Sequence, residues 1–152
     1  IHDAISLTAG LAGRMAVQGV ALGVAVGFGK KNDMENRVSG PFNADNLMTR
    51  YYDDSANTHT DWVVYYVPAE DCIFEAQIDD TAETGVVGEG YDIIVGSGST
   101  STGLSDMEVN GDAKTIDGDV VIVEIPDIAE NDHTAAFGRY WFKFVNTEFN
   151  NV

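Results

Sequence analysis

The chain has 152 residues, of which 44% are hydrophobic and 10% aromatic, so it can bury the core of one domain and is not wholly disordered. Its formal net charge of −17 at pH 7 repels polyanions, which argues against nucleic acid and anionic membranes as partners. Abundant Gly, Thr, Val and Asp favour an all-β protein over a helical bundle. Adaptation to high salt is an alternative explanation of the acidity.

The charge is unevenly distributed along the chain. Residues 1–31 contain one acid and three bases, a net charge of +2, whereas residues 32–152 contain 24 acids and five bases, a net charge of −19. This contrast predicts an N-terminal glycine- and valine-rich arm or first strand over residues 1–31, followed by an acidic β-domain over residues 32–152.

Residues 17–29, VQGVALGVAVGFG, carry two overlapping periods. Glycines recur every fourth residue, as in packed membrane helices, but the apolar run of 15–28 is shorter than the roughly 20 residues that a spanning helix needs. A secretory signal is disfavoured because Lys30 and Lys31 follow the run in place of a small-residue cleavage site. A period of two instead predicts a strand. Its bulky face would hold Val20, Leu22, Val24, Val26 and Phe28, opposite a face of Gly and Ala.

A strand this rich in glycine loses much conformational entropy on ordering, so it must pair with its own domain or with another chain. The first outcome makes it a core strand, and the second makes it a docking strand for a partner. The candidate docking residues are the bulky face and its flanking residues: Arg14, Val17, Val20, Leu22, Val24, Val26, Phe28, Lys30 and Lys31.

Six later runs have strand character, and turn signals separate them. They are residues 61–67, 72–78, 91–95, 107–109, 120–125 and 139–145. Alternation in 72–78 and 139–145 predicts one buried and one exposed face for each. A single helical turn is predicted at 44–51. The spacing predicts a small β-sandwich or β-barrel, jelly-roll-like, with an extended N-terminal arm.

No motif for catalysis or cofactor binding emerges. Residues 97–103, SGSTSTG, lack the lysine of a phosphate-binding loop, and no GxSxG nucleophile elbow occurs. The three histidines form no HxxxH pair, and Cys72, expected to be a half-buried structural thiol, is the only cysteine. We therefore predict no catalytic residues, no cofactor and no enzyme activity.

One acidic stretch partly matches a calcium-binding loop. Positions 1, 3, 5, 6 and 12 of such a loop would be filled by Asp106, Glu108, Asn110, Gly111 and Asp117. Glutamate at position 3, aspartate at position 12 and the lack of flanking helices depart from the pattern. The favoured interpretation is an Asn110-Gly111 turn between two strands of a hairpin, with calcium binding as the alternative. We therefore predict no metal site.

Several stretches together resemble a known family. They are the Gly/Ala/Val-rich arm, PFNADNLMTRYYDD, DWVVYYVPAEDCIFEAQI, GEGYDIIVGSGSTSTGLSDMEV, DGDVVIVEIPD and GRYWFKFVN. In their style and order they resemble tailed-phage capsid decoration proteins, also called cement or head-stabilising proteins. The resemblance covers most of the chain without a diagnostic short motif.

The resemblance implies a structural virion protein on the outer capsid surface, which bridges major capsid subunits and stabilises the head. It implies the major capsid protein and further copies of the chain, as a homo-trimer, as partners, with no nucleic acid and no membrane. It provides no catalytic residues. The alternative is a secreted or cell-surface β-sandwich binding module, in which Tyr51, Tyr52 or Trp62 would be candidate ligand platforms.

Overall fold

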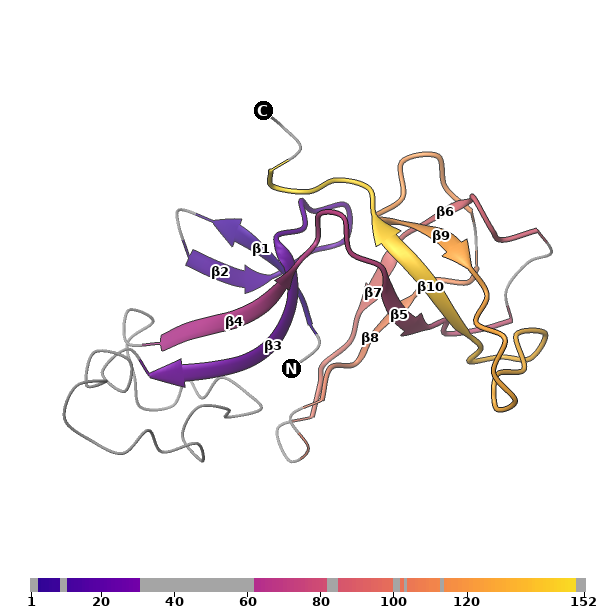
Figure 1. Ribbon diagram of the computed structural model, residues 1–152. Coiled ribbons are helices and arrows are strands. Elements are labelled where there is room, and N and C mark those ends of the chain that lie inside the picture. The colour runs from indigo at the N-terminus through magenta and orange to yellow at the C-terminus, as the bar shows by residue number, and fades with distance from the viewer. Residues whose placement is uncertain are drawn as a thin grey trace.

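The computed structural model describes residues 3–8, 11–30, 62–81, 85–99, 102, 104–112 and 114–149. These residues form ten β-strands and no helix, so the prediction of an all-β protein is confirmed (Figure 1). Within the same ranges, no helix has the length and hydropathy to cross a membrane. The helical turn predicted at 44–51 lies outside the described residues.

The N-terminal segment and one later strand build a four-stranded antiparallel sheet, on the left of Figure 1. Its strands, in spatial order, are β2 (Leu11–Arg14), β1 (Ala4–Thr8), β3 (Gly23–Lys30) and β4 (Trp62–Pro68). Residues 4–30 therefore contribute three strands, where the sequence predicted only the third.

A β-bulge in β3 divides its bulky side chains between the two faces of this sheet. Cross-strand partners share a face, and Val24 pairs with Val67 whereas Phe28 pairs with Val64, because the register shifts after Ala25. Val24 accordingly packs against the main hydrophobic core, and Phe28 packs against a second cluster. The prediction that the bulky residues of 20–28 share one face is therefore wrong.

The remaining strands form a second unit. A four-stranded antiparallel sheet has the order β5 (Phe74–Gln77), β10 (Arg139–Phe144), β9 (Val120–Glu124) and β6 (Gly90–Tyr91). A two-stranded sheet pairs β7 (Ile93–Val95) with β8 (Met107–Val109). Because β7 follows β6 after one residue and Ile78 bridges to Val109, the strands close into a ring.

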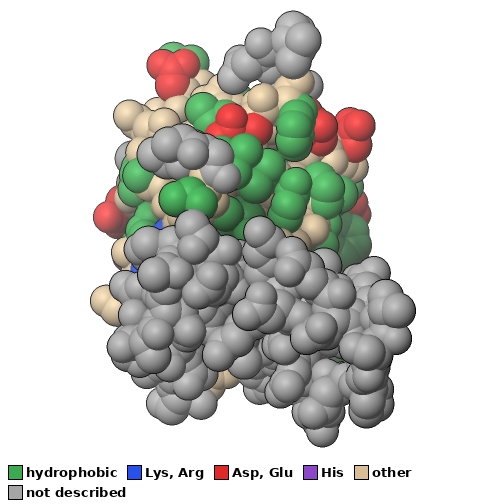
Figure 2. Space-filling view, turned by 90° about the vertical axis from the view of Figure 1, so that its left-hand side faces the viewer, with side chains coloured by type: hydrophobic (Ala, Val, Ile, Leu, Met, Phe, Trp, Pro, Cys, Tyr) green, Lys and Arg blue, Asp and Glu red, His purple; other side chains and the backbone are tan. Residues whose placement is uncertain are grey.

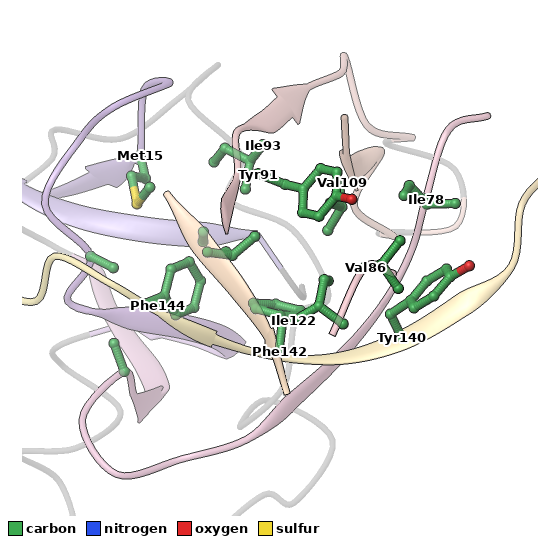
Figure 3. Close-up of a cluster of buried hydrophobic side chains, with 14 residues drawn as sticks. Met15, Ile78, Val86, Tyr91, Ile93, Val109, Ile122, Tyr140, Phe142 and Phe144 are labelled. Atoms are coloured by element: carbon green, nitrogen blue, oxygen red, sulfur yellow. The ribbon is translucent and has the colours of Figure 1, made fainter. Parts of the chain in front are cut away.

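The ring encloses the main hydrophobic core (Figure 3). Phe142 and Phe144 of β10 meet in a T-shaped contact with ring centroids 5.4 Å apart, and Phe74 of β5 lies 5.9 Å and 5.5 Å from them. Ala4 and Met15 belong to the same core cluster, so the N-terminal segment packs directly on the ring.

Several predicted strands agree closely with the structure. The run at 107–109 coincides with β8, and the alternation predicted for β5 and β10 is confirmed by their burial. The run at 91–95 divides at Asp92 into two strands, since the chain changes its partner there from β9 to β8.

Candidate docking surface

The β1–β2 hairpin forms the outer edge of the first sheet. Strand β2 pairs with β1 from Arg14 opposite Ile5 to Leu11 opposite Thr8, and it is the terminal strand of its sheet. All four of its residues are exposed. An edge strand with both faces exposed is a template for pairing with another chain.

Apolar side chains remain in solvent around this hairpin. Leu11 is 52% exposed, Leu7 on β1 is 40% exposed, and Val17 in the following turn is 47% exposed. Figure 2 views the molecule from the side on which β1 and β2 lie in Figure 1, and hydrophobic side chains gather there with acidic ones interspersed. We call Leu7, β2 and Val17 together the hairpin surface.

The ladder determines which backbone groups face the open edge. The Met15 N–H donates to the Ala4 carbonyl at 2.9 Å, which fixes the phase of the hairpin. Alternate residues of an antiparallel pair direct their polar groups to opposite edges. The backbone N–H and C=O groups of Gly13, like those of Met15, therefore point toward β1. The same groups of Ala12 and Arg14 point away from β1, to the outer edge of the sheet.

The other edge of β1 is already satisfied. Its first residues pair with β3, and beyond them the Leu7 N–H donates to Glu148 Oε1 at 3.1 Å. The carboxylate thus occupies a donor that would otherwise also be available for pairing. Among the described residues, no strand pairs with the outer edge of β2, so this is the edge of the hairpin that is open for pairing.

The charged residue on β2 is held only loosely. Arg14 Nη2 lies 3.2 Å from Asp3 Oδ1, and the Ser105 hydroxyl donates to the same oxygen at 2.6 Å. Exposed ion pairs of this kind contribute less than about 1 kcal/mol, so the guanidinium can exchange this partner for another.

The structure separates the predicted docking residues. Arg14 and Val17 are exposed on the hairpin surface. Leu22 is buried in the second cluster, next to Ile5 and Ala25. The remaining apolar members are half-buried: Val20, Val24, Val26 and Phe28.

The two lysines at the end of the predicted docking segment fall at the limit of the described residues. Lys30 ends β3, but its side chain is not described, and Lys31 lies outside the described residues. The docking role of the full set stays a prediction.

The acidic stretch at 106–117 is not a hairpin. Strand β8 pairs with the preceding strand β7, and residues 110–119 connect it to β9, with which it does not pair. The interpretation of Asn110-Gly111 as the turn of a two-stranded hairpin is therefore wrong. Gly111 instead lies buried against Ile78, and its N–H donates to Asp79 Oδ1 at 2.7 Å. Close backbone approach, not turn geometry, explains this glycine.

The other candidate functional side chains are dispersed over the structure. Over the described ranges, no three His, Cys, Asp or Glu side chains are arranged to hold a metal ion. Cys72 is a half-buried free thiol, as predicted. His133 is exposed and His2 and His59 lie outside the described residues, as do Tyr51 and Tyr52.

Sequence reasoning missed the hairpin surface. The strands are only five and four residues long, and β2 lacks a buried face that would create alternation. The sequence offered only a weak signal, a single glycine, Gly10, between two short runs.

Comparison with known proteins gives no relative. No protein-family model, curated protein or solved structure matches the chain. Its function must therefore be inferred from its own chemistry and geometry.

Proposed function

We propose that this protein is a structural virion protein that decorates the outside of an icosahedral phage capsid and stabilises it by bridging major capsid subunits. The observation that carries the proposal is the open edge of β2, where Ala12 and Arg14 direct backbone groups outward and Leu11 is exposed. The sequence resemblance to capsid decoration proteins supplies the class of partner.

Docking would proceed by strand addition. A segment of the major capsid protein pairs along β2. Its side chains on one face of the sheet pack on Leu11, and those on the other face pack over Ala12 toward Leu7. Ala12 and Arg14 offer two N–H donors and two C=O acceptors, and each added hydrogen bond contributes about 1 kcal/mol net. A homo-trimer multiplies this modest contribution, because the second and third contacts form at high effective concentration.

The distribution of charge along the chain supports docking with the N-terminal segment toward the capsid. Residues 1–31 carry a net charge of +2 and residues 32–152 carry −19. Docking through β2 places the least acidic segment against the partner and leaves the acidic remainder in solvent. This arrangement also disfavours nucleic acid as the partner.

The test is co-sedimentation of the purified protein with undecorated capsids, using an edge variant. Ala12→Pro removes an outward N–H without removing a bond to β1, and proline is tolerated on edge strands. We expect at least tenfold weaker binding with an unchanged melting temperature. Deleting residues 1–31 is less informative, since Ala4 and Met15 belong to the main core.

The matched control is Ala129→Pro. Ala129 is exposed and follows Ile128, whose carbonyl accepts the Asn131 N–H at 2.9 Å, so proline enters a turn position that it favours. This variant should bind like wild type. Undiminished binding of Ala12→Pro would refute docking through β2, and wild-type protein that ignores capsids of every host tested would refute decoration.

A secreted or cell-surface binding module is the second candidate, and one residue favours it. Trp141 on β10 is 36% exposed, and its Nε1–H donates to Glu75 Oε2 at 3.1 Å. Arg139 Nη1 lies 3.3 Å from the other oxygen of the same carboxylate. An indole held in place among polar groups offers a flat apolar face on which a sugar ring can stack. Glycan-array binding that Trp141→Ala abolishes and exposed Ile73→Ala preserves would support this candidate over decoration.

A further inference from the structure

The ring of strands closes where the end of β5 meets β8. Ile78 forms a parallel bridge with Val109, and both side chains belong to the main core (Figure 3). The Asp79 N–H donates to the Val109 carbonyl at 3.0 Å, and Asp79 Oδ1 accepts the Gly111 N–H at 2.7 Å. We call these three contacts the seam, since they join two strands that would otherwise be edges.

The sequence places a chemically labile pair at the end of this seam. Asn110-Gly111 is the one position in the chain where glycine follows asparagine. The side-chain amide of an asparagine is open to attack by the backbone nitrogen of the next residue. Glycine hinders this attack least, because it has no Cβ and a permissive backbone. The pair therefore has the chemistry of a spontaneous deamidation site.

Deamidation consumes one water and releases one ammonia. The Gly111 nitrogen loses its proton and bonds to Asn110 Cγ, the Cγ–Nδ2 bond breaks, and the amide takes up a proton and leaves as ammonia. Water then opens the resulting five-membered succinimide at one of its two carbonyls. One opening gives aspartate, and the other gives isoaspartate, in which the main chain runs through Cβ and Cγ and is one carbon longer.

The fold opposes the first step of this reaction. The Gly111 N–H that must lose its proton is bonded to the Asp79 carboxylate, whose negative charge disfavours a second negative charge on that nitrogen. The amide under attack is held as well, because Asn110 Oδ1 accepts the Asp112 N–H at 3.0 Å. The Asn110 N–H donates to the Asp92 carbonyl at 2.9 Å, which fixes the backbone on the other side. Ring closure requires these restraints to be released.

We propose that Asn110 is a latent deamidation site that the bond between Asp79 and Gly111 keeps unreactive, and that it reacts when the seam opens locally. A hydrogen bond to a charged group corresponds to roughly a ten- to hundredfold change in an equilibrium constant. Deamidation in the folded protein should therefore be slower than in the unfolded chain by at least about tenfold. The proposal does not depend on whether the protein binds a capsid.

The products of the reaction do not fit the closed seam. Isoaspartate lengthens the main chain between Val109 and Gly111, yet Gly111 lies so close to Ile78 that an added Cβ would come within 3.1 Å of Ile78 Cγ1. Aspartate keeps the length of the main chain but adds a negative charge one residue from the N–H that Asp79 binds. Either product weakens the seam, so deamidation converts a reversible local opening into a permanent one.

The test is peptide mapping by mass spectrometry of the full chain incubated at pH 8, with the deamidated fraction of Asn110 followed over time. Asp79→Ala should deamidate at least about tenfold faster in buffer than wild type does. The matched control Asp112→Ala removes an exposed carboxyl group but keeps the N–H that holds Asn110, so it should deamidate like wild type. Equal rates in the three proteins, or equal wild-type rates in buffer and in unfolding urea, would overturn the proposal.

A second measurement uses wild type alone and is decisive even if Asp79→Ala fails to fold. Below the urea concentration that unfolds the protein, an opening confined to the seam exposes little surface, so its frequency depends only weakly on urea. The frequency of global unfolding rises steeply with urea. The deamidation rate should therefore stay nearly constant over this range. A rate that rises in parallel with the unfolded fraction would contradict local opening at the seam.

A third measurement tests the permanence of the opening. Deamidated protein, separated from wild type by ion exchange, should exchange the backbone amide hydrogens of the peptide 76–80 faster than wild type does. Unchanged exchange would show that the seam accommodates the product, and it would refute a permanent opening.

Discussion

Asn131 fastens the loop between β9 and β10 through its side-chain amide. Its Nδ2 donates to the carbonyl oxygens of Pro126 and Arg139 at 3.2 Å and 2.9 Å, and its Oδ1 accepts the Arg139 N–H at 2.8 Å. Asn131→Ala removes all three bonds from a half-buried site. At about 1 kcal/mol for each bond, we expect a loss of about 3 kcal/mol in the free energy of unfolding.

The assay is urea unfolding at pH 7 together with a thermal melt. A loss of that size lowers the urea midpoint at constant slope and lowers the melting temperature by about 6–12 °C. Asn131→Asp keeps the acceptor but places a carboxylate against two carbonyl oxygens, so it should destabilise at least as much. The control is Asn146→Ala, an exposed asparagine, which should change the unfolding free energy by less than about 0.5 kcal/mol.

The reasoning fails if Asn131→Ala unfolds like Asn146→Ala. That result would mean that water replaces the amide at no cost and that the loop does not depend on it. A changed urea slope would instead indicate that the variant opens the β9–β10 loop before global unfolding.

Two other predictions concern close packing and alkaline pH. Gly23→Ala should lower the free energy of unfolding in urea by about 3 kcal/mol, because a Cβ there would collide with the Val67 carbonyl. The control Gly13→Ala adds a Cβ in open space and should leave that free energy unchanged. Equal effects of the two substitutions would contradict the tight contact between β3 and β4. Burial raises the pKa of Tyr140, whose hydroxyl donates to the His133 carbonyl at 2.9 Å. The neutral hydroxyl therefore stabilises the folded state fully below the usual tyrosine pKa, and this stabilisation is lost as pH rises above about 10. Tyr140→Phe should therefore be less stable by about 1 kcal/mol at pH 8 and lose less stability between pH 9 and pH 11, and an unchanged alkaline profile would refute this role.

Local patterns predicted the strands of the ring well. Strand β10 has alternating Tyr140, Phe142 and Phe144, and those side chains are its buried face. Strand β8 was short but bounded by polar residues, and its limits were correct. These features depend on side-chain period and turn residues, which a sequence displays directly.

Features that depend on pairing were not predictable in the same way. The bulge in β3 reverses its alternation, and nothing in residues 17–29 indicates the position of the extra residue. Asp119 resembles its acidic neighbours in the sequence, yet it alone among the acids of the described segments is almost fully buried. Its environment is created by Ile93 and by a turn about 100 residues earlier in the chain.

The place of β10 has a consequence for how the protein is made. Among the described strands β10 comes last along the chain, yet it lies between β5 and β9 inside its sheet. A growing polypeptide therefore releases β5 and β9 from the ribosome before the strand that pairs with both, and one edge of each stays unpaired until residues 139–144 emerge. Exposed edges of neighbouring nascent chains are prone to join one another. The large negative charge of the acidic segment repels other copies during this interval, so it protects the chain before folding as well as after it.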